Sequence, residues 1–233
     1  MAQADPIRTR AEVDLVLVDE HGRRDVYLFE HSLRIAAAAE KIAGMEGVPG
    51  PIDPQVLRAS ALYHDAGWAE QFRGSTVTRV EVLSRPTNDV QREIAADLLT
   101  ERLATVMHRR SLETAASAIR HMNDRRTDLP EAQVLAEAEN LDDLGVISLW
   151  QLVRRHSFEG KGVQAAIDTW QRQRDYRFWD ARIHDAFRFE PTRAIARARL
   201  IALEPVYEAL GRLQAGEDLA VAKLTLDPHD MPK

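Results

Sequence analysis

Histidine and acidic residues in four short stretches could together bind a metal ion. His64 and Asp65 stand side by side in ALYHDAGW, an otherwise apolar run that favours a helix. Burying an imidazole beside a carboxylate is costly unless something satisfies both, and a divalent metal ion is one candidate. The other stretches are FEHSLRIA, AIRHMND and AENLDDLG, which contain His31, His121, Glu139 and Asp142. Glu139 and Asp142 are three residues apart and therefore share a helical face.

The available ligand types restrict the metal. The sequence has no cysteine, so a metal site must use His, Asp or Glu. Mixed nitrogen and oxygen ligands suit Mn, Fe, Co, Ni or Zn better than Ca, which prefers oxygen alone. We expect one divalent ion of this group, with Mg also open. It would lower the pKa of its bound water and polarise a phosphoryl oxygen.

A phosphorylated substrate would also need positive side chains, because the acidic ligands repel its phosphate. The candidates for substrate binding are Arg34, Arg73, Arg120, Arg125 and Arg126. His64 and Asp65 are candidate catalytic residues, and His121 is a third that could hold the phosphate or take a proton. The ordinary alternatives stay open. A single arginine is more often solvated surface, His121 could cap its helix, and an acidic run such as ENLDD is usually a solvated face.

The elements that must position these groups are predicted to be helices. Apolar residues recur with helical spacing over 25–45, 55–66, 88–108, 111–122, 130–155, 163–176 and 191–213. Gly67 is expected to end the second of these. The stretch 72–88 is expected to be irregular, an active-site flap, with its Val-rich middle open to a short strand. VDLVLVD at 13–19 is the best strand candidate.

Composition indicates an ordinary globular protein. The chain of 233 residues is 45% hydrophobic and 29% charged, enough for a sizeable core. Its net charge of -6 gives no reason to expect nucleic acid or an anionic membrane as a partner. No apolar stretch approaches a membrane span or a signal peptide, so we expect a cytoplasmic protein. We predict an all-α fold with an N-terminal segment (1–25), one domain (26–215) and a polar tail (216–233).

The order of the candidate residues resembles the HD superfamily of metal-dependent phosphohydrolases, whose pattern is H…HD…D on an all-α fold. YLFEHSLRIAAAAEKIA is similar to the helix of its first ligand, ASALYHDAGW to its LLHDIG segment, and AENLDDLG to its ADRLDALG segment. AIRHMND and PTRAIARARLIAL also resemble family helices, the latter those of one bacterial subgroup. The resemblance implies metal ligands at His31, His64, Asp65 and a later carboxylate. It also implies hydrolysis of a phosphate monoester or nucleotide through a metal-activated water.

Two positions depart from the family pattern. Glu139 stands where the pattern has Asp. Its position favours Glu139 as the fourth ligand, and Asp142, one turn further on, is the alternative. Nucleotidase and alarmone-hydrolase members often carry an acidic residue shortly after His-Asp. Here AGW follows and Glu70 comes only later, which argues against those two activities.

Two other functions remain open. Some relatives of the family are oxygenases with two irons, and these need two further histidines between the His-Asp pair and the last ligand. This chain offers His108 and His121, but none in NDVQREIAADLL, where the first is expected. We therefore prefer one metal and a hydrolase. The second alternative is a non-catalytic module that binds metal and a nucleotide in the same pocket.

Overall fold

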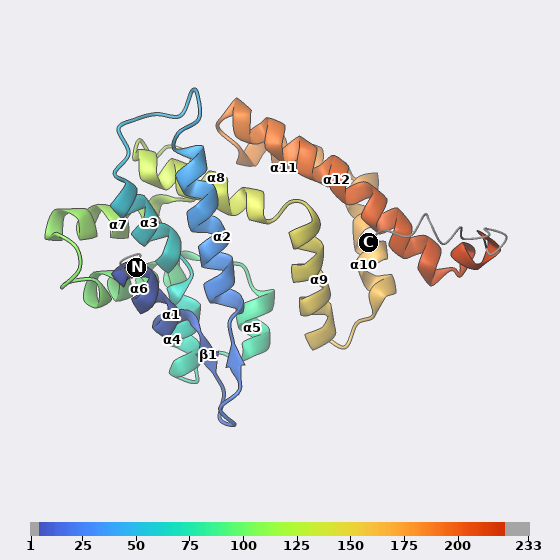
Figure 1. Ribbon diagram of the computed structural model, residues 1–233, viewed down its shortest axis with the longest axis horizontal. Coiled ribbons are helices and arrows are strands. Elements are labelled where there is room, and N and C mark those ends of the chain that lie inside the picture. Colours follow the sequence, from blue (N-terminus) through green and yellow to red (C-terminus); the bar gives the residue numbers. More distant parts are fainter. Residues whose placement is uncertain (1–4, 222–233) are drawn as a thin grey trace, which may run out of the picture.

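Helices make up most of this computed structural model, which describes residues 5–221 (Figure 1). The all-α class predicted from the sequence is confirmed. The elements are α1 (Pro6–Leu15), β1 (Leu17–Val18), β2 (Arg24–Asp25), α2 (Tyr27–Ile42), α3 (Pro54–Tyr63), α4 (Ala66–Arg73), α5 (Arg79–Ser84), α6 (Asp89–Arg102), α7 (Arg109–His121), α8 (Pro130–Asp142), α9 (Val146–Phe158), α10 (Val163–Asp175), α11 (Phe178–Ala186), α12 (Glu190–Gln214) and a short 3-10 helix, Glu217–Val221. Most of the predicted polar tail, 222–233, lies outside the described residues.

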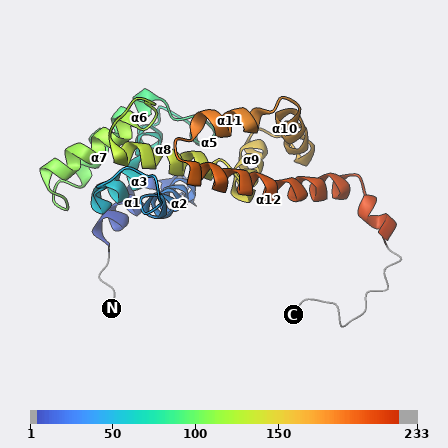
Figure 2. The same cartoon turned by 90° about the horizontal axis from the view of Figure 1, so that it is seen from above.

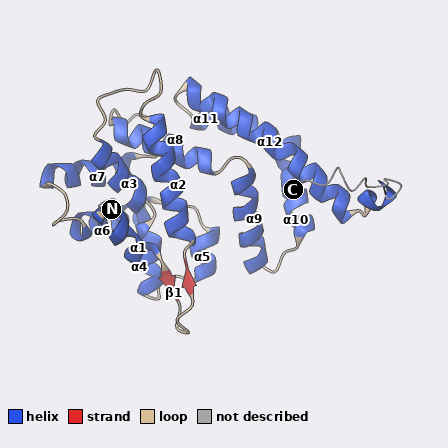
Figure 3. Ribbon diagram, viewed as in Figure 1, coloured by secondary structure: helices blue, strands red, loops and turns tan. Residues whose placement is uncertain are grey.

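The N-terminal segment contains a helix that the sequence analysis missed. Asp5 begins α1, because its side chain accepts from the backbone N–H groups of Ile7 and Arg8, and Pro6 suits the first helical position. The strand predicted at 13–19 is therefore mostly wrong. Only Leu17–Val18 pairs, antiparallel with Arg24–Asp25, in the small sheet of Figure 3.

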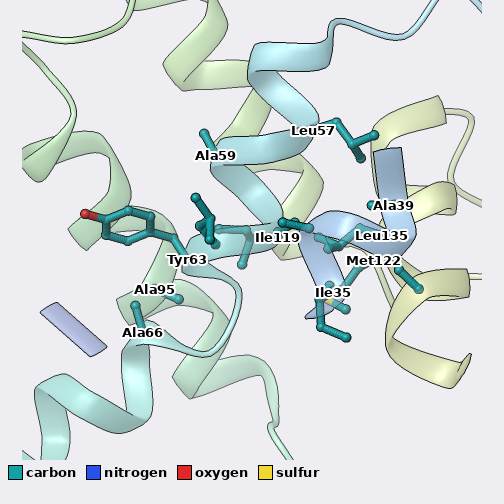
Figure 4. Close-up of a cluster of buried hydrophobic side chains, with 14 of the residues drawn as sticks. Ile35, Ala39, Leu57, Ala59, Tyr63, Ala66, Ala95, Ile119, Met122 and Leu135 are labelled. Atoms are coloured by element: carbon teal, nitrogen blue, oxygen red, sulfur yellow. The ribbon is translucent and has the colours of Figure 1, made fainter. Parts of the chain in front are cut away.

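The main core lies where α2, α3, α6, α7 and α8 pack together. Ile35 and Ala39 of α2 meet Leu57 of α3, Ile119 of α7 and Leu135 of α8 in the cluster of Figure 4. Many of the buried positions are alanines, such as 59, 61, 95, 96, 115 and 138. Small side chains let helix axes approach closely, so this part forms a rigid base for the residues it carries.

Two glycines were misread from the sequence. Gly67 does not end a helix but lies inside α4, where a Cβ would come within 2.1 Å of the Gln91 backbone oxygen. It is needed because α4 and α6 touch there. Gly145 has a φ of +90°, which favours glycine, and it separates α8 from α9. The single helix predicted over 130–155 is therefore two helices.

The stretch 72–88 is also more regular than predicted. It contains the short helix α5, which begins with a capping box between Thr78 and Glu81. The Val-rich middle is helical because this box starts a helix directly before it. Thr87 follows in the loop between α5 and α6.

The C-terminal helices α9 to α12 form a second layer, joined to the first where α12 packs against α8 and α9 packs against α5. Figure 2 shows α12 running along one side, with α10 and α11 beyond it. Buried Glu137 of α8 accepts from the Arg188 backbone N–H and the Thr192 hydroxyl, at the start of α12. The layer has its own small apolar cluster, in which the rings of Trp170 and Tyr207 stack 4.6 Å apart. Within residues 5–221, no helix has the length and hydropathy needed to cross a membrane.

Candidate metal centre

Four side chains that lie far apart in the sequence converge on one point. They are His31 of α2, His64 and Asp65 between α3 and α4, and Glu139 of α8, and one ligand atom of each lies within 4.8 Å of the others. The Nε2 atoms of His31 and His64 are 3.2 Å apart. Glu139 Oε2 lies 3.2 and 3.1 Å from those two atoms. Asp65 Oδ2 lies 3.6 Å from each of them.

A break between two helices lets the His-Asp dipeptide face one point. Adjacent side chains in a continuous helix point about 100° apart. Here α3 ends at Tyr63 and α4 begins at Ala66, so His64 and Asp65 occupy the turn between them. The break is therefore what brings both side chains to the same site.

Hydrogen bonds hold both imidazoles with Nε2 towards the site. His64 Nδ1 lies 2.8 Å from the carbonyl oxygen of Ala61. His31 Nδ1 lies 2.8 Å from Asp142 Oδ2. Both partners are acceptors, so we assign the proton to Nδ1 in each ring, which leaves a lone pair on Nε2. This is the arrangement of metal-binding histidines in proteins.

Asp142 lies behind His31 and is saturated by hydrogen bonds. Arg34 donates to it through two nitrogens, each at 2.9 Å, and Gln151 of α9 donates at 2.8 Å. Together with His31, these groups use both carboxylate oxygens. Asp142 is thus placed to orient His31, while Glu139 presents an oxygen to the point of convergence.

The charges of the site shift the pKa values of its groups. Burial lowers the pKa of His31, but Glu139 and Asp142 outweigh it, and the result lies well above the usual 6.5. Burial raises the pKa of Asp142, but the hydrogen bonds from His31 and Arg34 outweigh it and lower this pKa to about 2. The carboxylates therefore favour a positive charge at this point, supplied by protons or by a cation.

The residues present fit a metal ion. Ligands at about 2.0–2.2 Å from one ion lie about 3 Å from each other, close to the distances of 3.1–3.6 Å between these atoms. Glu139 Oε2 is buried and accepts no well-aligned hydrogen bond, although a buried oxygen normally has a partner. A cation bound between the two Nε2 atoms and the carboxylates would satisfy it.

The metal-binding group opens into a cavity of about 570 Å³. Thr87 supports one side, since its hydroxyl donates to Asp65 Oδ1 at 2.6 Å and accepts from the Trp68 indole N–H at 2.9 Å. Arg92 lies beside it, lines the cavity and donates to the Thr87 carbonyl oxygen at 3.0 Å. Arg92 is buried, and its Nε has no partner among the described residues. Its other two nitrogens donate to Thr87 and to Asp89, so Nε is the donor left for an anion.

A carboxylate and a second arginine line the same cavity. Asp143 forms an ion pair with Arg182 of α11. Burial and the negative charge of Glu139 raise the pKa of Asp143 to about 6, against the opposite effect of Arg182.

The arginines predicted to bind substrate do not line this cavity. Arg34 is engaged by Asp142. Arg73 forms an ion pair with Glu70 and lines a separate depression near the β-strands. Their predicted role is not supported, because neither residue lines the cavity beside the metal-binding group.

The remaining predicted groups also lie elsewhere. Arg120 pairs with two carboxylates of α6, and Arg125 and Arg126 are exposed in the loop after α7. His121 is exposed, and its Nδ1 bonds to the Ser117 carbonyl oxygen, as a residue at a helix end can do. His108, the other histidine considered for a second iron, is exposed at the start of α7. Neither histidine lines the cavity, so neither adds to the metal-binding group.

Sequence reasoning missed several residues that do line the cavity. Thr87 lies in the stretch 72–88, which was interpreted only as a flap, and Arg92 lies in the helix predicted over 88–108, where nothing in the pattern singled it out. Arg155 and Arg182 belong to helices that the sequence separates from the motifs. No local pattern marks them, because only the packing of α9 and α11 brings them to the site.

Comparison with known proteins identifies the family. Residues 28–144 match the HD domain family, and this range contains all four converging side chains. The chain therefore belongs to the HD domain family. The search of curated proteins gave no significant match.

Two solved structures share the fold well beyond the matched residues. Bacillus subtilis YpgQ in complex with ADP is 17% identical with a TM-score of 0.55, and the match covers 88% of this chain and 92% of that one. A predicted HD superfamily hydrolase from an uncultured Thermotogales bacterium is also 17% identical, with a TM-score of 0.52 and 90% of each chain covered. Coverage of this extent includes helices on the C-terminal side of the family match.

Proposed function

We propose that this protein is a metal-dependent phosphohydrolase that cleaves the phosphate ester of a nucleotide with water. The convergence of His31, His64, Asp65 and Glu139 beside a buried arginine carries the proposal. Membership of the HD family supports hydrolysis, and the ADP bound by YpgQ supports a nucleotide as the substrate class. The cavity of about 570 Å³ lies within the range of small-molecule sites.

Each group has a role in this proposal. His31, His64, Asp65 and Glu139 would hold the ion, and Asp142 would orient His31. A divalent ion, when bound, supplies Lewis acidity, which polarises a phosphoryl oxygen and acidifies water. Arg92 would bind the phosphate and offset the repulsion between that anion and the carboxylates. Thr87 would fix the positions of Asp65 and Arg92 relative to each other, since its hydroxyl donates to Asp65 and its carbonyl oxygen accepts from Arg92.

The test combines metal analysis with a phosphatase screen of nucleotides and sugar phosphates. The purified protein should contain about one divalent ion per chain, because the described residues offer one such group of ligands. A nucleotide should be hydrolysed, and Arg92→Met should weaken that activity while the metal content is kept.

Other outcomes would favour the alternatives. Bound metal without turnover of any phosphate ester would support a non-catalytic binding module. Two bound irons with consumption of dioxygen would support the oxygenase. Either result would overturn the proposal that this protein is a hydrolase.

A further inference from the structure

One face of α9 lines the cavity and carries an arginine beyond the metal centre. Ser148, Gln151, Leu152 and Arg155 all line the cavity. They stand at positions i, i+3, i+4 and i+7 and so share one side of the helix. Gln151 donates to Asp142, which places its end of this face beside His31. Arg155 lies one turn further along, a rise of about 5.4 Å.

The charge of Arg155 has no partner, unlike those of the other arginines in the cavity. Arg85, Arg92 and Arg182 form ion pairs with Glu81, Asp89 and Asp143 respectively. Among residues 5–221, Arg155 has no carboxylate within ion-pair distance and its side chain donates to no acceptor. Glu159, one turn later, is bonded by Lys161 instead. A half-buried arginine that lines a cavity and has no acceptor of its own suits an anionic ligand.

Donors on α11 add to this part of the cavity. Trp179 and Arg182 line it, and the indole Nε1 of Trp179 and Nε of Arg182 are buried without a hydrogen-bond partner. Buried donors usually find a partner, so a ligand rich in acceptor oxygens would satisfy them. An apolar group, which has no acceptor atoms, would leave all of them unpaired.

We propose that Arg155 binds a second anionic group of the substrate and makes the site select nucleoside diphosphates over monophosphates. This inference rests on the proposed function, in which the first phosphate lies at the metal centre beside Arg92. Arg92 lies on α6 and Arg155 on α9, so the two arginines reach the cavity from different helices. Guanidinium groups bind phosphate through paired hydrogen bonds, which fits a second phosphate attached to the first.

The experiment measures binding independently of turnover. Dissociation constants are measured by calorimetry on the protein as purified, for α,β-methylene-ADP and for a non-hydrolysable analogue of AMP in which CH₂ replaces the ester oxygen (written AMP below). The wild type should bind the diphosphate analogue about 10-fold or more tightly than AMP. Arg155→Met should weaken binding of the diphosphate analogue about 10- to 100-fold, which is the contribution of a hydrogen bond to a charged group. It should leave AMP unchanged, and Arg155→Lys should retain part of the preference.

The control is Arg110→Met, which removes an exposed arginine of α7 outside the cavity lining and should change neither constant. Equal affinity of the wild type for the two nucleotides would overturn the inference, and so would equal weakening of both by Arg155→Met. If the preference is seen and is lost in Arg155→Met while no ester is hydrolysed, the inference holds and the proposed hydrolase fails. If esters are hydrolysed without any preference, the inference fails alone.

Discussion

The family-matched part of the chain, 28–144, and the C-terminal layer of α9 to α12 are built differently. The first is a close-packed core of small apolar residues, and its polar groups around the site are bonded to each other except for Glu139 Oε2 and Arg92 Nε. The second has a small apolar cluster, and polar contacts such as those of Glu137, Asp142 and Asp143 tie it to α8. It also brings donors without partners to the cavity. We infer that the first part forms the reactive centre, and that the second decides which molecule fits it.

The largest expected effect concerns the metal ligands of the first part. His64→Ala and Asp65→Ala should each abolish bound metal, because each removes a ligand from a site with four. The helices should stay folded, since neither side chain belongs to the apolar core. Metal content by elemental analysis and helicity by circular dichroism check this.

The chain provides a matched control for that comparison. His184 and Asp185 form a second His-Asp dipeptide, exposed on α11 in the C-terminal layer. His184→Ala and Asp185→Ala should leave metal binding unchanged. Unchanged metal content in both the His64 and Asp65 variants would show that the site is placed wrongly.

The next largest effect distinguishes the role of Glu139 as a metal ligand from that of Asp142, which orients His31. Glu139→Gln should weaken metal binding strongly, because it removes a charge that we place on the ion. Asp142→Asn should lower metal affinity about 10- to 100-fold, as is typical when a group that orients a metal ligand is changed. Metal titrations of the two variants compare them. A larger loss for Asp142→Asn would mean that the fourth ligand lies one helical turn later.

Metal binding should also depend on pH. The pKa of His31 is raised in the folded protein without metal, so its proton stabilises that state below pH 6.5. This stabilisation is lost as pH rises through the raised pKa. The protein stripped of metal should therefore lose thermal stability above neutral pH, and the metal-loaded protein should not.

Metal affinity should instead rise with pH, by about 10-fold per pH unit for each proton that the metal displaces. Melting temperatures with and without metal and a titration series between about pH 6 and 9 measure both effects. If the melting temperature of the stripped protein did not change over this pH range, the raised pKa of His31 would be contradicted.

The smallest effect tests whether the second layer reaches the metal centre. Gln151→Ala should weaken metal binding on the order of 5-fold, the value of one hydrogen bond. The loss should be smaller than for Asp142→Asn, because Arg34 and His31 still hold the carboxylate. Gln173→Ala is the control, since Gln173 lines the cavity without contacting Asp142. Equal effects of the two variants would show that α9 has no specific part in the centre.

The sequence by itself determined the fold class and the candidate ligands of the metal centre. Helical periodicity is local, and the types and order of His31, His64, Asp65 and Glu139 are visible without a structure. The first turn of α1 and the separation of α8 from α9 also have local causes, the cap at Asp5 and the backbone of Gly145. They were missed because a cap and a single glycine are weak signals beside a long apolar pattern.

Only the tertiary structure decided which groups surround the ligands. Asp142 meets His31 across 111 residues of chain, and Arg182 reaches Asp143 from another helix. Of the arginines chosen from the sequence, Arg34, Arg73 and Arg120 form ion pairs with carboxylates, and Arg125 and Arg126 are exposed away from the cavity. No local sequence pattern identifies the arginines that line the cavity, because the packing of the helices decides where their side chains point. The residue types of the candidate metal ligands can be seen in the sequence, whereas the groups around those ligands depend on how distant helices pack.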